Sequence, residues 1–507
     1  MITLYTLIKF QRGKIMKHSK DFNVQNERNL TMLVDFYELT MGNGYLDNKL
    51  QDKIAYFDMF FRRIPDGGGY CIMAGVQQLI EYLSNLSFSN DDISYLKSKN
   101  IFSDDFLDYL RAFKFSCDVW AVPEGYPVFP GEPLVIVKGP IIQAQFVETM
   151  ILLTINHQTL IATKSSRICR AANGRPVMEF GSRRAQGYDG AIYGARAAVI
   201  GGCVGTACTI AEEMFGIPAM GTMAHSWVQL FDCEYDSFKA WAETYPDNCV
   251  LLIDTYNVLL SGVPNAIKVF NEVLKPLGKR PKGIRIDSGD ITYLTKKVRI
   301  MLDAAGYEDV KITISNSLDE YIIRGVLENG AQIDNFGVGE RLITARSEPV
   351  FGGVYKLVAV ENNGEIIPKI KISENEEKIT NPAFKKLYRI FDKTSHKAIA
   401  DLITLHNEVI DESKPLEVFN PIFTWKKKKL KNYYIKDMMV KIFENGNPIY
   451  ESPSVMEIRA FSVKEVSKLW SEVLRFENPH AYYVDLSSDL WNLKQGLLTY
   501  YSETFEE

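Results

Sequence analysis

A regular alternation of short β-branched runs with amphipathic helical runs, between residues 177 and 344, constrains the fold more than any other feature of this sequence. Such alternation is typical of βα units repeated around a parallel sheet. Two of the expected helices, at 206–215 and 291–305, stop at Gly216 and Gly306, as glycine C-caps predict. The six expected strands span residues 177–180, 217–220, 250–253, 283–286, 311–314 and 333–336.

Each of these six runs is followed by charged, hydroxyl-bearing or glycine residues. Parallel α/β sheets bind ligands at the carboxyl ends of their strands, so polar residues there predict a ligand site. If the sheet closes into a barrel, all six ends converge on one cup. The ends read Gly181-Ser182-Arg183-Arg184, Gly221-Thr222 leading to His225-Ser226, Asp254-Thr255, Asp287-Ser288-Gly289-Asp290, Ser315-Asn316 and Gly337-Val338-Gly339-Glu340.

The segments on either side predict further domains, because 507 residues exceed what one hydrophobic core usually supports. We expect an N-terminal α+β domain at 22–146, the β/α region at 147–368 and a C-terminal region at 369–507, which carries no recognisable chemistry. Other expected elements are helices at 32–43 and 463–474 and extended runs at 55–61, 134–137 and 433–442.

Charge and hydropathy predict a soluble cytoplasmic protein with neither nucleic-acid nor membrane partners. Lysine plus arginine total 58 against 63 acidic residues, and the net charge of −5 offers no general positive field for a nucleic-acid backbone. The lysine run 426–429 is interpreted as a solvated surface. No uncharged run approaches the ~20 residues that span a bilayer. The apolar stretch 2–10 is too short for a signal peptide, and Met16 is an alternative start that would make 1–15 an extension.

The seven cysteines are scattered and odd in number, and they lack the CxxC spacing of a zinc or redox centre. We therefore expect buried or free thiols in a reducing compartment. They are Cys71, Cys117, Cys169, Cys203, Cys208, Cys233 and Cys249.

Two of the strand ends have the character of phosphate loops. The run from Asp287 to Asp290 lies between a strand and a helix, where backbone N–H groups and the Ser288 hydroxyl suit a phosphate. Asp and Ser are equally the ordinary N-cap residues of a helix, so a simple helix start is the alternative. Gly337 and Gly339 allow a second close backbone approach, although glycine-rich turns are common after strands.

Three further residues are candidates for anion chemistry. Arg183 and Arg184 present planar donors that suit a carboxylate or phosphate. Their alternative role is a surface ion-pair network with acids such as Asp189. His225 is a candidate nucleophile, and its alternative role is that of an ordinary hydrogen-bonded histidine.

With these residues in view, the chain resembles bacterial nicotinate phosphoribosyltransferases from about Asn29 to Val360, and more loosely beyond. Six motifs occur in the family's order, which makes coincidence a poor explanation. They are DFYELTM at 35–41, FGSRRAQGYDGA at 180–191, GTMAHSW at 221–227, IRIDSGD at 284–290, ISNSLDE at 314–320 and GGVYKLVAV at 352–360.

The resemblance implies an α/β fold with an irregular β/α barrel of the type II phosphoribosyltransferases, an N-terminal α+β domain and a C-terminal region. It also implies the reaction of nicotinate with 5-phosphoribosyl-1-pyrophosphate to give nicotinate mononucleotide and pyrophosphate, coupled to ATP hydrolysis. This is the first step of NAD salvage from nicotinate. The implied cofactor is Mg²⁺, with ligands that the residues do not identify, and the implied assembly is a homodimer.

The resemblance also assigns roles. His225 resembles the phosphorylatable histidine of the family, and it is expected to be catalytic together with Asp287 and Arg285. Glu340 and Tyr188 depart from the threonine and proline that are frequent in relatives, so a phosphate contact at Glu340 is expected from the backbone. The expected substrate-binding residues are Tyr37, Arg183, Arg184, Thr222, Ser226, Arg285, Ser288, Gly289, Asp290, Asn316, Gly337 and Gly339; Tyr37 and Arg285 are expected to stack on and grip nicotinate.

Three other classes of protein fit these residues less well than a nicotinate phosphoribosyltransferase. A nicotinamide phosphoribosyltransferase places an aspartate near the substrate amide, but the corresponding run 202–206 has no acid, which favours a carboxylate substrate facing Arg285. An aldolase or isomerase would need a lysine at a strand end for Schiff-base chemistry, and the six ends contain none. In a noncatalytic regulator the six polar ends would have no purpose.

Overall fold

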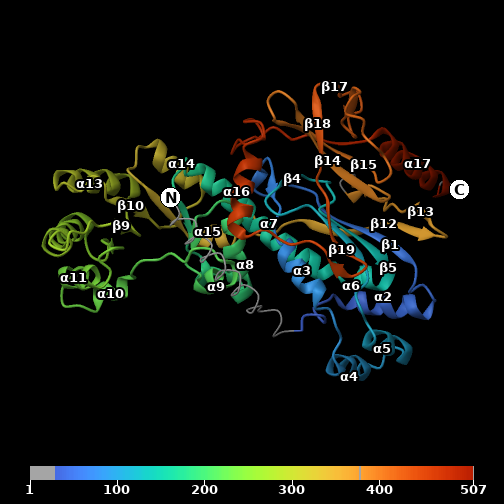
Figure 1. Cartoon of the computed structure of the whole chain (residues 1–507), viewed down its shortest axis with the longest axis horizontal. Coiled ribbons are helices and arrows are strands. Elements are labelled where there is room, and N and C mark those ends of the chain that lie inside the picture. The colour runs from blue at the N-terminus through green and yellow to red at the C-terminus, as the bar shows by residue number, and fades with distance from the viewer. Residues whose placement is uncertain (1–28, 376–377, 506–507) are drawn as a thin grey trace, which may run out of the picture. The chain divides into compact units, whose positions relative to one another are not determined.

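The computed structural model describes residues 29–375 and 378–505, which form two compact units (Figure 1). Among these residues, unit 1 comprises Ile161–Pro349, and unit 2 comprises the chain before it and Val350 onward. The boundary falls inside helix α7 (Glu148–Ala171). The domain limits after residues 146 and 368 stay a prediction, and the proposed start at Met16 lies outside the described residues.

Unit 1 contains a six-stranded parallel sheet of order β7-β6-β11-β10-β9-β8. An isolated parallel bridge between Thr206 and Ala219 continues it beyond β7. The α/β class is confirmed; no pairing within the described part of the chain joins Ala219 to β8, so a closed barrel is not shown. The strands are β6 (Val177–Glu179), β7 (Gly205–Thr206), β8 (Val250–Leu252), β9 (Gly283–Ile286), β10 (Lys311–Ile314) and β11 (Asn335–Val338).

The expected bounds of β9 and β10 are confirmed, whereas the strand expected at 217–220 is wrong. Pro218 has no N–H to donate to a ladder, and only its carbonyl contributes, by accepting the N–H of Thr206 at 3.0 Å. The short strand β7 was not expected, because Gly205 and Thr206 form no apolar run. β11 begins two residues later than expected, since the Asp334 carboxylate accepts the N–H of Ile312 at 2.9 Å.

Helices connect the strands of unit 1, as βα units require. The glycine stops are confirmed, because Gly216 (φ 66°) and Gly306 (φ 80°) adopt the left-handed conformation that ends α9 and α13. Helix α9 starts at Thr209 rather than 206, since Gly205 and Thr206 belong to the sheet. The helices are α8 (Gly187–Ile200), α9 (Thr209–Phe215), α10 (His225–Gln229), α11 (Glu234–Thr244), α12 (Val263–Val269), α13 (Ile291–Ala304), α14 (Glu320–Glu328) and α15 (Glu340–Ile343).

Unit 2 is built on a seven-stranded sheet of order β13-β12-β1-β5-β3-β19-β20. Strand β1 lies inside this sheet; its sequence IAYFDMFF is almost entirely buried, and it pairs antiparallel with β12 and β5. Strands from both ends of the chain therefore share one sheet. They are β1 (Ile54–Phe61), β3 (Asp118–Ala121), β5 (Val135–Pro140), β12 (Gly353–Asn362), β13 (Glu365–Pro368), β19 (Val440–Glu444) and β20 (Asn447–Pro448).

A four-stranded sheet of order β18-β14-β15-β21 follows in the C-terminal part of unit 2. The extended run expected at 433–442 is divided between β18 and β19, because Asp437 accepts the N–H of Met439 and turns the chain. The smaller pairs are β2 (Cys71–Ile72) with β4 (Pro127–Val128) and β16 (Leu416–Phe419) with β17 (Lys427–Leu430). The four-stranded sheet contains β14 (Lys385–Asp392), β15 (Ala398–Leu405), β18 (Tyr433–Asp437) and β21 (Val484–Leu486).

Two expected helices of unit 2 have other bounds. The helix expected at 32–43 is α2 (Phe36–Asp47), because Asp35 is extended and acts as its N-cap residue. The helix expected at 463–474 is α16 (Val455–Val466), whose start is fixed by a capping box between Ser454 and Glu457. The remaining helices are α3 (Val76–Ser84), α4 (Asn90–Ser98), α5 (Asp104–Arg111), α6 (Ile141–Phe146) and α17 (Ser488–Phe505).

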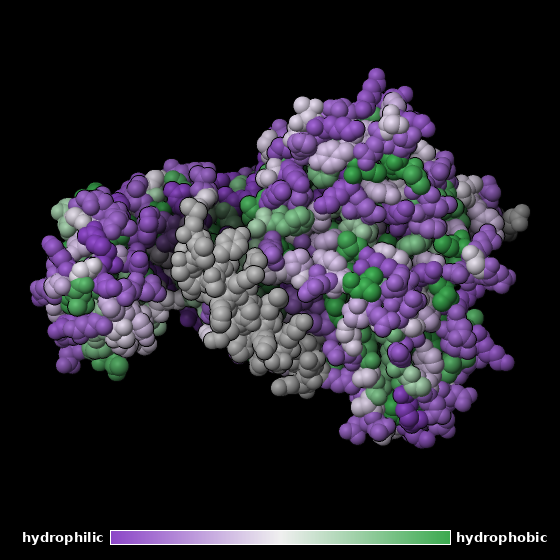
Figure 2. All heavy atoms as spheres, in the orientation of Figure 1, coloured by the Kyte–Doolittle hydropathy of each residue, from purple (hydrophilic) through white to green (hydrophobic). Residues whose placement is uncertain are grey.

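The surface is mainly hydrophilic on the face that Figure 2 shows. In the described part of the chain, no helix has both the length and the apolar character needed to cross a membrane. Lys427, Lys428 and Lys429 are exposed on β17, as expected for a solvated run. All seven cysteines are free thiols, of which only Cys233 is exposed.

A buried ion pair joins β14 to β15 in unit 2. Arg389 binds Asp401 through two guanidinium nitrogens, with Nη2–Oδ2 at 2.5 Å and Nε–Oδ1 at 2.8 Å, and both side chains are at most 1% exposed. Nη2 also donates to the carbonyl of Pro127 at 2.8 Å, and the Tyr482 hydroxyl donates to Asp401 at 3.0 Å. Burial raises the pKa of Glu132 well above its usual range, and neighbouring Asp401 raises it further.

We expect Arg389→Met to lower the free energy of unfolding of unit 2 by about 3–5 kcal/mol, since it leaves the Asp401 charge buried without a partner. Urea unfolding of the full chain measures the change. The control is Lys427→Met, which breaks an exposed pair with Glu417 and should cost less than about 1 kcal/mol. Equal losses in the two variants would contradict the assignment.

Candidate functional site

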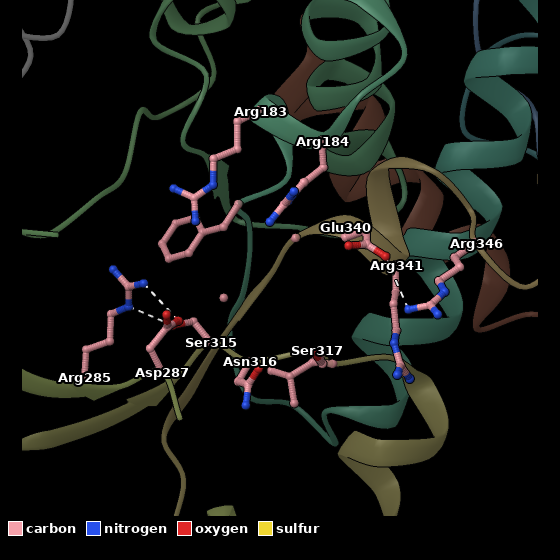
Figure 3. Close-up of a pocket in the computed structure, with 14 residues that line it drawn as sticks. Arg183, Arg184, Arg285, Asp287, Ser315, Asn316, Ser317, Glu340, Arg341 and Arg346 are labelled. Atoms are coloured by element: carbon pink, nitrogen blue, oxygen red, sulfur yellow. Dashed lines mark hydrogen bonds and ion pairs between the residues drawn. The ribbon is translucent and has the colours of Figure 1, made fainter. Parts of the chain in front are cut away.

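A cavity opens at the carboxyl ends of β9, β10 and β11 and beside the turn that follows β6 (Figure 3). Its walls are mainly polar, and they bring together seven of the residues that the sequence predicted. Its lining residues are Phe180, Arg183, Arg184, Arg285, Asp287, Ser315, Asn316, Ser317, Leu318, Gly337, Gly339, Glu340, Arg341 and Arg346.

Arg285 is the most constrained cation of this cavity. It lies on β9 with a side chain only 15% exposed. Its Nε donates to Ser315 Oγ at 2.7 Å, and its Nη2 donates to Asp287 Oδ1 at 3.1 Å. Its Nη1 donates to Thr222 Oγ1 at 3.0 Å and to the carbonyl of Met223 at 3.5 Å. Because a guanidinium has five N–H donors, four of them face protein acceptors and one is left for a ligand.

Asp287 connects the ends of three strands. Its Oδ1 accepts the Ser315 hydroxyl at 2.6 Å as well as Arg285. Its backbone N–H donates to Asp254 Oδ2 at 2.9 Å, and the Ser288 hydroxyl donates to the same oxygen at 2.6 Å. Asp254 is buried and follows β8, so it holds the turn after β9 against the end of β8.

The rest of the Asp287 to Asp290 run forms the start of α13. Gly289 has φ 87°, a left-handed backbone conformation that favours glycine. Asp290 is the N-cap residue, and its Oδ1 accepts the N–H of Tyr293 at 2.8 Å. Asp290 therefore has the helix-capping role that was the alternative interpretation, and Ser288, Gly289 and Asp290 do not line the cavity.

His225 is the first residue of the short helix α10 and is 39% exposed. Its Nδ1 lies 3.1 Å from Thr255 Oγ1, and its Nε2 lies 3.8 Å from Asp287 Oδ2. The second distance is too long for a hydrogen bond and is that of an ion pair when the ring is protonated. His225 thus contacts the cavity through Asp287, as Thr222 does through Arg285.

Glycine is required where the chain passes Phe180. A Cβ on Gly337 would lie 2.5 Å from the Phe180 ring, and one on Gly339 would lie 3.1 Å from the Phe180 carbonyl. The Phe180 ring lies 5.8 Å from the Arg285 guanidinium. Both glycines therefore allow β11 and the turn after β6 to approach each other at the cavity wall.

Four further arginines give the cavity its positive character. Arg183 and Arg184 are exposed and extend toward the cavity in Figure 3. Neither is paired with a carboxylate in the part of the chain that the structure describes, so the expected alternative of an ion-pair network is not seen. Arg341 pairs with Asp319, and Arg346 pairs with Glu340 at 3.3 Å. The Glu340 carboxylate therefore faces the Arg346 guanidinium on the same wall of the cavity.

Two more predicted site residues do not line this cavity, in addition to Ser288, Gly289, Asp290, Thr222 and His225. Ser226 is exposed on α10 and does not line it. Tyr37 belongs to unit 2, on the first turn of α2, where it is 43% exposed. Burial raises the pKa of Tyr37, and the negative charge of Glu148 raises it further.

Sequence reasoning did not assign roles to several residues that the geometry brings to the site. Asp254, Thr255 and Ser315 stand among the six polar strand ends, so a signal for them was present. Arg341 and Arg346 carry no such signal, since they follow β11 within and beyond the short helix α15.

The described residues contain no group of three His, Cys, Asp or Glu side chains placed to hold a metal. Mg²⁺ does not require such a group, because it keeps several waters and binds through one or two carboxylates together with substrate phosphates. Asp287 is the carboxylate of the cavity wall that suits this mode.

Known proteins match the chain along most of its length. A family model described as "Nicotinate phosphoribosyltransferase (NAPRTase) family" matches residues 176–395. The N-terminal and C-terminal domain models of the same enzyme match residues 32–156 and 384–494. The nicotinate phosphoribosyltransferase of Bacillus subtilis is 43% identical over 480 residues, which cover 94% of this chain and 97% of that protein.

Solved structures of related enzymes also match this chain. The crystal structure of human nicotinic acid phosphoribosyltransferase has a TM-score of 0.82 at 28% identity, covering 91% of this chain and 99% of that chain. A nicotinate-nucleotide pyrophosphorylase from Pyrococcus furiosus shares the fold, with a TM-score of 0.67 at 23% identity over 88% of this chain and 98% of that chain. With three family models spread over residues 32–494 and identity across nearly the whole sequence, the chain belongs to the nicotinate phosphoribosyltransferase family.

Proposed function

We propose that the cavity of unit 1 is where this enzyme joins nicotinate to 5-phosphoribosyl-1-pyrophosphate, giving nicotinate mononucleotide and pyrophosphate. The observation that carries this proposal is the environment of Arg285, whose side chain is 15% exposed and whose Nη2 has one N–H left for a ligand besides the one that binds Asp287. A charged donor in this position suits the carboxylate of nicotinate better than the neutral amide of nicotinamide.

The arginines of the cavity suit the sugar substrate. Displacement of pyrophosphate from the ribose C1 builds positive charge on the ring and negative charge on the leaving group. Arg183 and Arg184, which have no carboxylate partners, are proposed to neutralise the phosphates. The backbone near Gly337 and Gly339 approaches closely enough to bind phosphate through N–H groups, and Asn316 adds a side-chain amide.

No general base is needed for the transfer itself. The pyridine nitrogen of nicotinate attacks C1 with its lone pair and loses no proton, while the C1–O bond to pyrophosphate breaks. The cavity must therefore hold the two substrates in line, which is the larger part of catalysis in such a reaction. Asp287 is proposed to bind the ribose hydroxyls near C1, where its charge opposes that of the ring in the transition state.

ATP, Mg²⁺ and a second copy of the chain complete the proposal. His225 is proposed to attack the γ-phosphate of ATP through Nε2, since Nδ1 is engaged by Thr255. The N–P bond forms as the bond to the β-phosphate oxygen breaks and ADP leaves, and water later hydrolyses the N–P bond to release inorganic phosphate. Mg²⁺ is proposed to enter with the pyrophosphorylated sugar. Further substrate contacts are proposed for Ser226, Ser288, Gly289, Asp290 and Tyr37. The proposed assembly is a cytoplasmic homodimer.

Incubation of the purified protein with 5-phosphoribosyl-1-pyrophosphate, Mg²⁺ and either nicotinate or nicotinamide tests the proposed reaction. We expect nicotinate mononucleotide to be detected by mass, with far less product from nicotinamide, because Arg285 forms a stronger, charge-assisted hydrogen bond with a carboxylate than with a neutral amide. Preferential conversion of nicotinamide would refute the substrate assignment. If neither base is converted to its mononucleotide, the proposed phosphoribosyltransferase function is refuted.

Arg285→Gln is expected to raise the KM for nicotinate by roughly 10- to 100-fold, because a charge-assisted hydrogen bond contributes about 1.5–3 kcal/mol. The KM for the sugar substrate should change much less. Steady-state kinetics with each substrate varied in turn measures both. The control is Lys239→Gln, which breaks an exposed ion pair with Glu243 on α11 and does not line the cavity. A wild-type KM for nicotinate in Arg285→Gln would show that Arg285 only holds the strand ends together.

His225→Ala is expected to abolish ATP hydrolysis and labelling of the protein by γ-labelled ATP, while ATP-independent synthesis continues. The reason is that the pyridine nitrogen does not need this side chain in order to attack C1. Retained phosphate is measured at alkaline pH, where phosphohistidine is stable. Equal labelling of wild type and variant would remove His225 from the coupling, and labelling of neither would refute the ATP requirement.

A further inference from the structure

The β16–β17 hairpin of unit 2 exposes three large apolar side chains at its turn. Ile422 is 57% exposed, Phe423 44% and Trp425 72%, and the centroids of the Phe423 and Trp425 rings lie 5.2 Å apart. Single exposed apolar side chains are ordinary on a protein surface, whereas a contiguous group of them marks an interaction site. These three residues form an apolar tip, and their exposure together indicates a partner surface.

Hydrogen bonds hold the apolar tip in place. Asn420 Oδ1 accepts the backbone N–H groups of Ile422 at 3.0 Å and of Phe423 at 2.8 Å, which fixes the turn. On helix α17, Trp491 Nε1 donates to the Pro421 carbonyl at 3.1 Å. The turn is thereby tied to the body of unit 2, while its apolar side chains stay on the outside.

A run of lysines follows the apolar tip directly, and β17, which carries most of it, projects at the edge of unit 2 (Figure 1). The segment 420–431 contains five lysines and no acidic residue, although the whole chain has a net charge of −5. Lys427 forms an exposed ion pair with Glu417 at 3.2 Å. Lys428 and Lys429 are exposed, and neither has an ion-pair partner among residues 29–375 and 378–505. The hairpin is therefore locally positive beside its apolar tip.

We propose that this hairpin docks the protein on the surface of an anionic lipid bilayer. The apolar tip enters the interfacial layer, where aromatic rings are favoured, and the lysines bind the anionic headgroups behind it. Lysine suits this position because its apolar stem can lie along the interface while its ammonium group stays with the phosphates. The two features of the hairpin, apolar at the turn and basic directly after it, match the two layers of such a surface.

Docking of this kind is peripheral and needs no spanning helix, and the described residues contain none. It goes beyond the proposed function, because none of the hairpin residues lines the cavity of unit 1. It also replaces the interpretation of the lysine run as only a solvated surface, and the expectation of no membrane partner. A single-stranded nucleic acid is a less suitable partner, since it stacks bases on aromatic rings but offers no apolar layer for Ile422.

Sedimentation of the full chain with vesicles tests the proposal. We expect binding to vesicles of phosphatidylcholine mixed with phosphatidylglycerol, weaker binding to phosphatidylcholine alone, and a decline as salt is raised. Trp425→Ala is expected to lower the partition coefficient about tenfold, as is Lys428→Glu combined with Lys429→Glu. Both variants should unfold at the wild-type temperature, because the changed side chains are exposed.

Helix α13 of unit 1 provides matched controls. Ile300→Ala removes an exposed apolar side chain, and Lys296→Glu combined with Lys297→Glu changes the net charge by the same amount as the hairpin variant. Both control variants should bind the mixed vesicles as wild type does.

Four results would overturn the proposal. The first is a wild-type chain that does not sediment with the mixed vesicles, or that binds phosphatidylcholine alone equally well. The second is an equal loss of binding in the α13 variants, which would show a general effect of charge. The third is tighter binding to a single-stranded oligonucleotide than to vesicles at the same salt, lost in Trp425→Ala. The fourth is a smaller oligomer for Trp425→Ala in gel filtration, which would make the apolar tip an interface between copies of the chain.

Discussion

The charge of Arg285 is the constraint on which the arrangement of the candidate site depends. A guanidinium stays charged at physiological pH, and this one is only 15% exposed, so nearby groups must compensate it. Asp287 supplies the negative charge, and Ser315 and Thr222 supply neutral acceptors. The ends of β9 and β10 and the segment before α10 are thereby held at one place. The site is in this sense assembled around a cation before any substrate is bound.

Asp287 is shared between this cation and His225, which gives it more than one task. It accepts from Arg285 and Ser315 on one oxygen and faces His225 Nε2 with the other, while Asp254 holds its backbone. Phosphorylation of His225 would bring negative charge toward the Asp287 carboxylate and change the balance around Arg285. The proposed coupling of ATP hydrolysis to synthesis would have a physical route through this shared carboxylate.

Unit 2 shows a related use of buried carboxylates. Asp401 compensates Arg389 in the core, where the pair connects two strands and serves stability. Glu148 faces Lys356 at 3.9 Å and accepts a hydrogen bond from Gln145 at 2.6 Å. The two pairs differ in exposure, since the Lys356 side chain is 34% exposed and the Arg389 side chain 1%.

Much of the candidate site was predictable, because strand periodicity and polar strand ends are local features. β9 and β10 have the bounds that their apolar runs predicted, and Arg285 and Asp287 stand where those runs end. The strand expected at 217–220 does not form, because Pro218 has no N–H to donate to a ladder. The expected bounds of α16 were wrong, although Ser454 and Glu457 form the capping box that marks its start. The sequence by itself determined the parallel α/β class, the glycine stops and the residue types at the strand ends. Only the tertiary structure decided that four donors of Arg285 face protein, that Asp254 holds a turn 33 residues away, and that β5 and β12, which are far apart in the sequence, flank β1. These features depend on contacts between residues that are far apart in the sequence, and no local sequence pattern encodes such contacts.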